Sequence, residues 1–311
     1  MAILTAGVAG IDFDDLKVAD LLLGDVTVAT AGQFTLRDGS WLEEFTGSFT
    51  YSNGEIAGGT IASWKESLNG QMVFNITGTS VPVTSLATWA ATGNDETARN
   101  AFLAGDDSIV GSNAIDRMHG YAGNDTVTGG GGDDFLRGEV GDDSIVGGAG
   151  FDDTHGNQGN DTVRGGDGPD WVVGGQGNDM LYGDAEGDVV YGNLGNDTQV
   201  GGDGIDWVRG GQGNDSLDGG LGDDWMSGDR GDDTLTGGAG ADLFNTFGDA
   251  GIDRVLDFNR AEGDRVKLEP GSTYTVDQVG ADTVIHVTGG AQMVLVNVQL
   301  SSLTGDWVFV G

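Results

Sequence analysis

A nine-residue pattern repeats through the middle of the chain and restricts the folds that it can adopt. Residues 102–245 divide into sixteen consecutive units of nine with no insertion. The sixth position is Asp in every unit, and the fourth is Gly in all but two units, which have Ala114 and Glu186. The eighth position is apolar in fourteen units, with Thr154 and Gln199 as the exceptions. Self-similarity at a short, fixed period predicts a solenoid of stacked coils.

Each recurring residue type has a physical reason. Closely spaced glycines permit positive φ and let backbone carbonyl groups converge within a turn. Calcium takes about six to eight oxygen ligands, which such carbonyls and the Asp carboxylates of successive turns can supply. The last three positions of the unit predict a short β-strand whose middle side chain faces inward. Two units form one coil, so the sixteen units predict about eight coils.

The charge balance indicates bound cations. The chain of 311 residues has 50 acidic and 13 basic residues, which gives a formal net charge of -37. Such a composition is typical of disorder, but here the Asp residues recur at fixed spacing. Charge repulsion excludes nucleic acid as a partner. The chain has no Cys, which excludes disulfides and thiolate zinc sites, and no apolar run approaches the ~20 residues of a transmembrane helix.

The repeated Gly-Gly-x-Gly-x-Asp-x-U-x pattern, in which U is apolar, resembles the hemolysin-type nonapeptide of the RTX (repeats-in-toxin) family. The resemblance implies an all-β fold built on a calcium-filled parallel β-roll, with multiple calcium ions. It also implies secretion by a type I system to the cell exterior or surface. A glycine-rich solenoid without calcium is the alternative, but it leaves the stacked aspartates uncompensated. By this resemblance the calcium ligands are Asp107, Asp116, Asp125, Asp134, Asp143, Asp152, Asp161, Asp170, Asp179, Asp188, Asp197, Asp206, Asp215, Asp224, Asp233 and Asp242.

The segment that follows the repeats has a different pattern. Within residues 246–311, Asp253, Asp257 and Phe258 form an Asp-x-x-x-Asp-Phe motif that resembles the C-terminal cap closing an RTX roll. The apolar strands after it, with a predicted turn at 289–290, are similar to the uncleaved C-terminal signal of type I secretion. The alternative is that these strands serve only as a cap, and both interpretations are compatible.

The segment that precedes the repeats is predicted to be β-rich. Residues 1–101 alternate polar and apolar side chains around Asn-Gly pairs at 53–54 and 69–70. Asn-Gly is a strong signal for a two-residue hairpin, so we expect a small antiparallel sheet. Two short helices are predicted at 84–93 and 94–105, where they would lead into the first coil.

No catalytic constellation is recognised in the chain. There is no His-Glu-x-x-His, which excludes an RTX metalloprotease, and no Gly-x-Ser-x-Gly, which excludes an RTX lipase. The Gly-rich runs lack the Lys of a phosphate-binding loop. An active site within residues 1–101 is the remaining enzyme hypothesis, but that region has no nucleophile and base in a recognisable arrangement. We therefore predict that the protein is not an enzyme.

The two sheets of the roll are predicted to differ, because consecutive units alternate between them. One sheet has mainly Ser and Thr at the seventh position. The other sheet has several aromatic residues at outward-facing positions. Such a row would be a large apolar patch, and in soluble proteins a patch of this kind is usually covered. Three covers are considered: a flanking segment of the same chain, a second copy, or a polysaccharide. A second copy is considered because Trp, Tyr and Arg are typical of interface centres, and a polysaccharide because aromatic rings stack on sugars. The residues of this predicted interface are Phe135, Trp171, Tyr191, Trp207, Arg209 and Trp225.

These observations favour a secreted, calcium-binding structural protein with three parts. They are a β-rich cap domain at 1–101, the β-roll at 102–245, and a C-terminal cap with a secretion signal at 246–311. We expect the chain to fold on calcium outside the cell and to self-associate into a surface layer, matrix or fibre. The alternative is a calcium-stabilised module that binds carbohydrate or another surface through its aromatic residues. The expected partners are calcium, further copies of the chain, the type I secretion machinery and, in the alternative, a surface polysaccharide.

Overall fold

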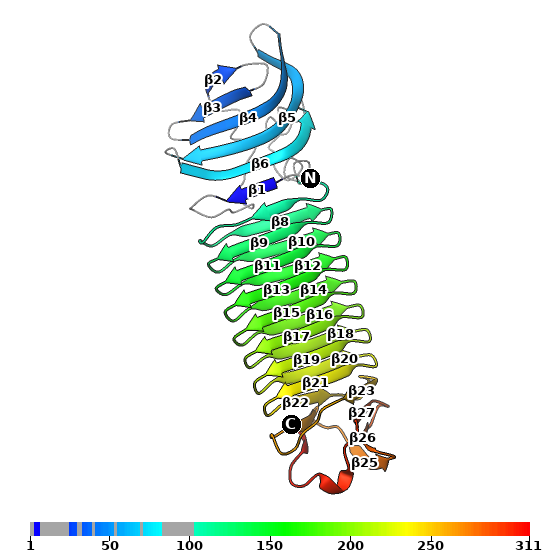
Figure 1. The fold of residues 1–311 in the computed structure, drawn as a ribbon. Coiled ribbons are helices and arrows are strands. Elements are labelled where there is room, and N and C mark those ends of the chain that lie inside the picture. Colours follow the sequence, from blue (N-terminus) through cyan, green and yellow to red (C-terminus); the bar gives the residue numbers. More distant parts are fainter. Residues whose placement is uncertain are drawn as a thin grey trace. The chain divides into compact units, whose positions relative to one another are not determined.

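The protein folds as an all-β parallel β-solenoid of about nine turns, with almost no helix in the described residues (Figure 1). The chain divides into two compact units, residues 1–145 and 146–311. Among the described residues, no helix has the length and apolar character needed to cross a membrane. This computed structural model describes residues 3–6, 25–29, 33–38, 41–52, 55–68, 71–82 and 103–311.

Long antiparallel strands form the first part of unit 1–145. β4 (Trp41–Ser52) pairs with β5 (Glu55–Leu68), and β5 pairs with β6 (Gln71–Pro82). Only the Asn-Gly pairs at 53–54 and 69–70 separate these strands, so the two predicted hairpins are confirmed.

Three shorter strands complete this antiparallel sheet. β2 (Asp25–Ala29) pairs with β3 (Gln33–Asp38), and β3 pairs with β4. β1 (Ile3–Ala6) pairs with β6 at the other side of the sheet. Phe45 and Ile61, on β4 and β5, are fully buried, so the long strands contribute the apolar contacts of this region.

The roll begins in the same unit. β7 (Ser108–Val110) pairs in parallel with β9 (Thr126–Gly131), and β8 (Arg117–Ala122) pairs in parallel with β10 (Phe135–Val140). β1 pairs in parallel with β7, so the antiparallel sheet and the first roll strand share one hydrogen-bonded ladder. The two predicted short helices fall mostly on residues 83–102, which lie outside the described residues.

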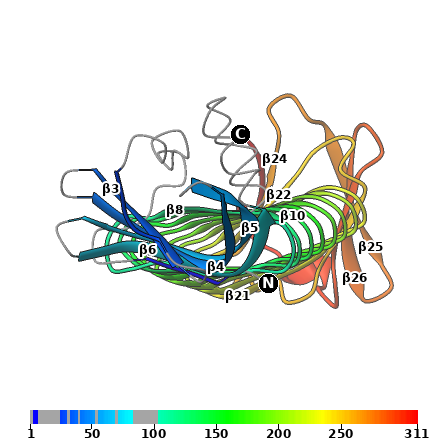
Figure 2. The same ribbon diagram turned by 90° about the horizontal axis from the view of Figure 1, so that it is seen from above.

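Unit 146–311 continues the roll, and the strands of its regular repeats pair with one another at a spacing of 18 residues, as Trp171 does with Val189. Seen from above in Figure 2, successive coils of this unit lie over one another. β11 (Ser144–Ala149) spans the boundary of the two units. The strands that follow are β12 (Asp153–Gln158), β13 (Thr162–Asp167), β14 (Trp171–Gln176), β15 (Met180–Ala185), β16 (Val189–Leu194), β17 (Thr198–Asp203), β18 (Trp207–Gln212), β19 (Ser216–Leu221), β20 (Trp225–Arg230), β21 (Thr234–Ala239) and β22 (Leu243–Thr246).

These strands are longer than the three-residue segments predicted from the pattern. β14 has six residues because it continues through the first three positions of the next unit. Trp171 is exposed, Val172 and Gly174 face inward and are buried, and Val173, which faces outward, is also buried, at 6% exposure. A Cβ atom at Gly174 would collide with the carboxylate of Asp179. The first Gly of the repeat is therefore required for space inside the roll, rather than for positive φ.

The fourth Gly of the repeat is required for both space and backbone conformation. Gly213 has a φ of 142°, and a Cβ atom on it would overlap the carbonyl oxygen of Gly195 in the preceding coil. The second position also takes positive φ, but it admits Asn193 at 79° and Asp229 at 70°. Asn and Asp tolerate the left-handed region better than other side chains, so they replace Gly where space permits.

One edge of the roll is reinforced by a ladder of exposed Asp and Asn side chains at the fifth position. In unit 146–311, the Asn178 N–H donates to Asn160 Oδ1 at 2.9 Å, and the Asn196 N–H donates to Asn178 Oδ1 at 2.7 Å. Asn214 and Asp232 continue the same ladder. These hydrogen bonds explain why every fifth position on this edge is Asp or Asn.

The parallel sheets continue past Asn245, where the regular repeats end. β23 (Ile252–Val255) pairs with β21, and β24 (Arg265–Leu268) pairs with β22. β27 (Gln292–Leu295) then pairs with β23, and β28 (Val308–Val310) pairs with β24. The C-terminal segment therefore adds coil layers to the roll, although its sequence lacks the nine-residue pattern.

An antiparallel hairpin and an aromatic cluster complete the C-terminal segment. β25 (Tyr274–Val279) pairs with β26 (Asp282–Val287), and β26 pairs with β27 across the predicted turn at 289–290. The short 3-10 helix η3 (Leu300–Ser302) precedes β28. Phe258, from the predicted Asp-x-x-x-Asp-Phe motif, lies 6.0 Å from the Phe244 ring and 6.3 Å from the Trp307 ring, centroid to centroid. These rings extend the apolar interior beyond the last regular unit.

Replacing Gly213 by Ala should unfold the roll at lower denaturant concentration, because the new Cβ atom overlaps the Gly195 carbonyl oxygen. We expect a loss of about 3 kcal/mol or more, at the upper end of single-substitution effects. Gly280→Ala is the matched control, because Gly280 also has positive φ but has no atom within 4 Å of a built Cβ. Its expected loss is about 1 kcal/mol. Urea titrations in calcium-containing buffer measure both, and equal losses would contradict the packing argument.

Candidate metal centre

The sixteen predicted calcium-ligating aspartates all lie inside the roll. Each is at most 3% exposed, although ionised carboxylates are almost never fully buried without a compensating partner. Each Asp directly precedes a strand position whose side chain faces outward, so alternation along the chain directs the carboxylate inward. The structure therefore brings the predicted residues together in two series, one at each edge of the roll.

One oxygen of each carboxylate stabilises the stacking of coils. In unit 146–311, Asp170 Oδ1 accepts the backbone N–H of Asp152 at 2.8 Å, and Asp188 Oδ1 accepts that of Asp170 at 2.8 Å. At the opposite edge, Asp197 Oδ1 accepts the N–H of Asp179 at 2.9 Å. Unit 1–145 has the same bond, in which the Asp125 N–H donates to Asp143 Oδ1 at 2.8 Å. Hydrogen bonds to charged acceptors are among the stronger ones, so these ladders fix the register of successive coils.

In nine of these carboxylates the second oxygen, Oδ2, is buried without a hydrogen-bond partner among the described residues. A buried acceptor left unsatisfied costs about 1–3 kcal/mol, and more if it is charged. A regular series of such atoms therefore calls for a bound group that the protein atoms do not supply. The Oδ2 atoms in this condition belong to Asp125, Asp170, Asp179, Asp188, Asp197, Asp206, Asp215, Asp224 and Asp242.

Six of these nine Oδ2 atoms face a backbone carbonyl oxygen across the first Gly of their unit. A Cβ atom built at Gly201 would lie 2.5 Å from Asp206 Oδ2 and 2.5 Å from the Gly219 carbonyl oxygen. At Gly219 the corresponding atoms are Asp224 Oδ2 at 2.5 Å and the Gly237 carbonyl oxygen at 2.6 Å. We call this arrangement of an Asp Oδ2 and a Gly carbonyl oxygen around the first Gly the oxygen cradle. Its oxygens are the ligand type that hard divalent cations such as calcium prefer.

The oxygen cradles rely on backbone groups as much as on side chains. Among the described residues, no three His, Cys, Asp or Glu side chains gather at one point. A cation in a turn would therefore bind one or two carboxylates together with Gly carbonyl oxygens. Calcium accepts such mixed oxygen sets at about 2.3–2.6 Å, so the residues present fit it.

Burial raises the pKa of the ladder carboxyls, because the charged form loses its hydration. The pKa of Asp179 and of Asp215 rises to about 7, and that of Asp188 to about 8. The accepted backbone N–H opposes this rise, and the negative charges of neighbouring ladder residues add to it. In the metal-free roll these carboxyls hold protons near neutral pH, and a bound cation would displace the protons.

Two further aspartates join the ladders outside the regular spacing. Asp264 Oδ1 accepts the Asp242 N–H at 3.1 Å, 22 residues along the chain rather than 18. Asp253 is fully buried and accepts the backbone N–H of Asp233. Burial and the Asp233 charge raise the pKa of Asp253 to about 8, and the accepted N–H opposes this rise. Asp253 is part of the predicted cap motif, whereas no role was predicted for Asp264. Both are followed by Arg-Val, so the Asp-x-apolar signal was present without the nine-residue period.

The predicted aromatic residues lie on the sheet of even-numbered strands. In unit 146–311, Trp171 is 49% exposed and Trp207 is 60% exposed, in register with one another through Val189. The Trp225 ring lies 5.5 Å from the Trp207 ring, centroid to centroid. Phe135 lies in the other unit, where the Arg117 guanidinium is 4.6 Å from its ring centroid. We call Trp171, Val189, Trp207 and Trp225 the aromatic row.

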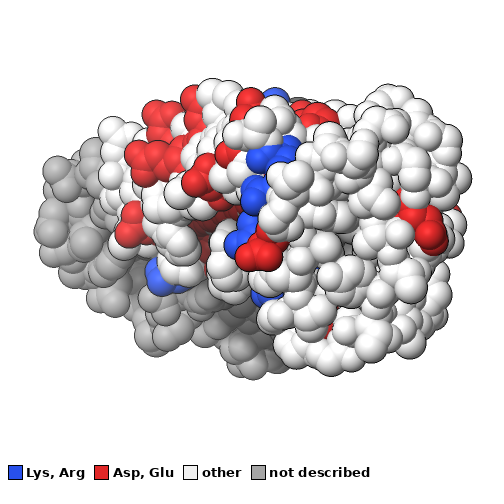
Figure 3. All heavy atoms as spheres, turned by 90° about the horizontal axis from the view of Figure 1, so that it is seen from below, with Lys and Arg blue, Asp and Glu red and all other residues white. Residues whose placement is uncertain are grey.

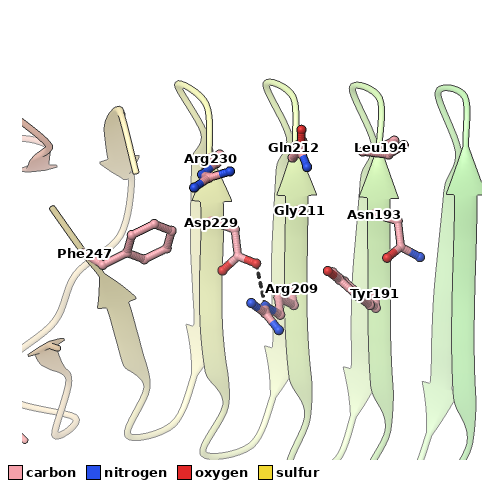
Figure 4. Close-up of a pocket in the computed structure, with 9 residues that line it drawn as sticks. All are labelled: Tyr191, Asn193, Leu194, Arg209, Gly211, Gln212, Asp229, Arg230 and Phe247. Atoms are coloured by element: carbon pink, nitrogen blue, oxygen red, sulfur yellow. Dashed lines mark hydrogen bonds and ion pairs between the residues drawn. The ribbon is translucent and has the colours of Figure 1, made fainter. Parts of the chain in front are cut away.

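A groove of about 330 Å³ lies beside the aromatic row (Figure 4). The Arg209 Nε donates to Asp229 Oδ2, and the Ser227 Oγ donates to Asp229 Oδ1 at 2.7 Å. The Arg209 guanidinium also lies 5.2 Å from the Tyr191 ring centroid. Tyr191 and Arg209 are residues of the predicted interface. Asp229 was not predicted, although it is visible as a replacement of the second Gly of its unit. The groove is lined by Tyr191, Asn193, Leu194, Arg209, Gly211, Gln212, Asp229, Arg230 and Phe247.

Basic side chains are few and locally concentrated. The view from below in Figure 3 shows Lys and Arg gathered in one strip, with acidic side chains beside them. With 13 basic residues against 50 acidic ones, the protein cannot neutralise its own charge through ion pairs. Compensation for the buried carboxylates therefore has to come from bound cations or protons.

Comparison with known proteins identifies the repeats. Residues 103–255 match the family model of the RTX calcium-binding nonapeptide repeat. No curated protein matches the chain. The segments matched by the family model overlap and are 103–136, 119–153, 128–163, 155–190, 164–199, 191–226, 200–235 and 219–255.

Two solved structures are similar to parts of the chain. The extracellular lipase LipA from Serratia marcescens is 21% identical with a TM-score of 0.30, over 57% of this chain and 40% of the lipase. The AlgE6R3 subunit of the mannuronan C5-epimerase from Azotobacter vinelandii is 26% identical with a TM-score of 0.18, over 40% of this chain and 78% of that subunit. The similarity thus spans less than half of the lipase.

The family predicted from the spacing of Asp and Gly is the family whose model matches the chain. The match extends to residue 255, which includes β23 beyond the last regular unit. RTX nonapeptide repeats bind calcium, and proteins that carry them are typically secreted. Through residues 103–255, the chain belongs to the family of RTX calcium-binding nonapeptide-repeat proteins.

Proposed function

We propose that this chain is an extracellular structural protein whose β-roll folds as calcium enters the oxygen cradles. The observation that supports this most directly is the series of buried Asp Oδ2 atoms without hydrogen-bond partners. When bound, calcium supplies two positive charges and a requirement for several oxygen ligands. The sixth-position aspartates, from Asp107 to Asp242, would hold the ions together with the carbonyl groups of the Gly turns.

The apolar interior of the roll is narrow, which makes cation binding important for stability. Each regular unit buries one eighth-position side chain, such as Val172, Leu181 or Val190, between the two sheets. This small favourable contribution to the free energy of folding is opposed by the entropy cost of ordering nine residues and by the cost of burying one carboxylate. The binding free energy of calcium is then part of the folding free energy, as in other proteins whose sites form only on folding.

The proposed location follows from the same linkage. RTX repeat proteins are typically secreted. Calcium is scarce inside cells, where the Asp series would repel itself and leave the chain unfolded and competent for export. We propose that a type I secretion system exports the chain and that calcium outside the cell then drives its folding.

Self-association is the proposed use of the folded roll. The aromatic row exposes Trp171 and Trp207, which are 49% and 60% accessible. Trp is strongly enriched at the centres of protein interfaces, and exposed apolar patches of this kind typically mark such contacts. We propose that a second copy of this chain covers the row, giving a surface layer, matrix or fibre.

A second candidate function is saccharide binding at the groove beside the aromatic row. The groove combines the Tyr191 ring with the side chains of Asn193, Arg209, Gln212 and Asp229. Aromatic faces stack on sugar rings, and planar amide, carboxylate and guanidinium groups bind hydroxyl groups directionally. In this case the roll is a calcium-stabilised module that attaches to a surface polysaccharide.

Removing calcium should unfold the roll. We expect the β-sheet circular dichroism of the full chain to be lost on dialysis against a chelator and to return when calcium is added in excess. Magnesium at the same concentration is the control, because it prefers octahedral sites with several waters and should restore much less structure. A native spectrum that persists without divalent cations would contradict calcium-driven folding.

The stability of the roll should depend on pH in opposite directions with and without calcium. Folding raises the pKa of Asp179 and Asp215 from 3.8 to about 7, so without metal these groups stabilise the roll fully at low pH. That stabilisation is lost as the pH rises from about 4 to about 8. Calcium requires the ionised carboxylates, so in calcium the stability should rise over the same range. Urea midpoints at several pH values test this, and parallel trends in the two buffers would contradict it.

Removing the exposed indoles should abolish self-association while leaving the roll folded. In the double variant Trp171→Ser, Trp207→Ser, light scattering in calcium should report monomers where the wild type forms larger species. Met180→Ser is the matched control, because Met180 also occupies the seventh position and is 46% exposed, but lies on the other sheet. If the double variant assembles like the wild type, the aromatic row is not the interface. A monomeric wild type that binds polysaccharide through the groove would favour the second candidate.

A further inference from the structure

Gln199 is a buried polar residue in a row of apolar ones. It occupies the eighth position of its unit on β17 and is 0% exposed. Its register neighbours on β15 and β19 are Leu181 and Leu217, which are also buried. Burying a carboxamide among aliphatic side chains is unfavourable unless its hydrogen-bonding groups find partners. The residue therefore needs an explanation beyond core packing.

The Gln199 amide reaches across the interior to the opposite sheet. Its Nε2 donates to the Arg209 carbonyl oxygen at 2.9 Å and to the Gly210 carbonyl oxygen at 3.5 Å, both on β18. Its Oε1 is buried without a hydrogen-bond partner. The side chain is thus held by its donor group, and its target is a carbonyl oxygen of the type that builds the oxygen cradles.

The oxygen cradle at Gly192 contains this amide. A Cβ atom built at Gly192 would collide with Asp197 Oδ2 and with Gln199 Nε2, and would lie 2.5 Å from the Gly210 carbonyl oxygen. The amide nitrogen is therefore as close to the centre of this cradle as the two oxygens are. A carboxamide NH₂ group offers two donors, so it can satisfy oxygens that would otherwise face a cation.

The neighbouring cradles have the same oxygens but no amide. At Gly201 the three nearest atoms are Asp206 Oδ2, the Gly219 carbonyl oxygen and the Asp206 Cβ. At Gly210, on the same edge as Gly192, they are Asp215 Oδ2, the Gly228 carbonyl oxygen and the Asp215 Cγ. The difference at Gly192 is thus the side chain of Gln199 alone.

Thr154 shows that a polar eighth-position residue does not enter the cradle by itself. It is the other exception in the repeat and is also 0% exposed. Its hydroxyl donates to the Trp171 carbonyl oxygen at 3.3 Å. The nearest atoms at the cradle of its unit, around Gly147, are from Asp152 and the Gly165 carbonyl group. Thr154 therefore provides a matched comparison for Gln199.

We propose that the Gln199 amide takes the place of the cation in the Gly192 cradle, so that this turn of the roll binds no calcium. The Nε2 group donates to the Arg209 and Gly210 carbonyl oxygens, and it occupies the space beside Asp197 Oδ2 where an ion would otherwise lie, although Asp197 Oδ2 itself accepts no hydrogen bond. The calcium series is then interrupted at one position by a built-in substitute. This inference rests on the proposed calcium binding, and it makes a statement about stoichiometry that calcium-driven folding alone does not make.

Counting bound ions tests the proposal directly. Native mass spectrometry of the full chain, saturated with calcium, gives the number of ions on the wild type, on Gln199→Leu and on Thr154→Val. Leu is the residue at both register neighbours of Gln199, so the substitution fits the core pattern. We expect the Gln199→Leu variant to bind one ion more than the wild type, and Thr154→Val to bind the same number. Isothermal titration calorimetry provides an independent count.

The possible outcomes separate this proposal from the proposed function. A wild type that binds no calcium would remove the proposed function itself. An unchanged ion count in Gln199→Leu would overturn the substitution of ion by amide, and an unchanged count with weaker affinity would make Gln199 a calcium ligand through Oε1. Gln199→Met, which keeps the length of the side chain without its amide, is the second variant if Gln199→Leu does not fold. The same gain of one ion is expected from it.

Discussion

The inward-facing carboxylate of each turn is the constraint on which the rest of the roll depends. One of its oxygens accepts the backbone N–H of the Asp in the preceding coil, as Asp188 does from Asp170, which fixes the coils in register. Its other oxygen occupies the space beside the first Gly of the same unit, as at Gly183, so no side chain is possible there. The Gly in turn allows the strand to continue through it. One residue type therefore determines the coil spacing, the position of Gly and a buried charge that needs compensation.

That charge separates the roll from solenoids stabilised by their apolar interiors. Apart from the units with Thr154 and Gln199, each regular unit contributes one inward-facing apolar side chain at its eighth position, and a larger apolar cluster forms past the repeats, around Phe258 and Trp307. Raised pKa values in the ladders show the consequence, because a carboxyl such as Asp188 is stable in this interior only when it is protonated or bound to a cation. The repeats thus form a chain of potential ion sites, and in the proposed function the occupancy of these sites decides whether the fold is favourable.

The nine-residue repeat was enough to predict the regular coils of the roll. The residues that depart from the repeat could be placed only from the structure. Pairing of Trp171 with Val189 and burial of Val172 follow from an 18-residue coil with alternating side chains. Asp264 could not be placed from the sequence, because a longer connection moves it 22 residues from its ladder partner, and only the strand register shows the alignment. Gln199 was visible as an exception, but the position of its amide depends on the width of the interior. The groove also combines outward side chains from several coils, and a linear pattern does not show which of them converge.

The separation of charge and aromatic residues links folding to assembly. The aspartates lie inside the roll, whereas Trp171 and Trp207 lie on the outer side of one sheet. Two copies that meet through this sheet each carry a formal charge of -37 when no cation is bound, so their repulsion opposes contact. Ions in the turns reduce that repulsion and also align the strands on which the Trp residues are in register. In the proposed assembly, calcium would therefore act before the interface forms, and its binding would set both the alignment of the contact surface and the charge that opposes contact.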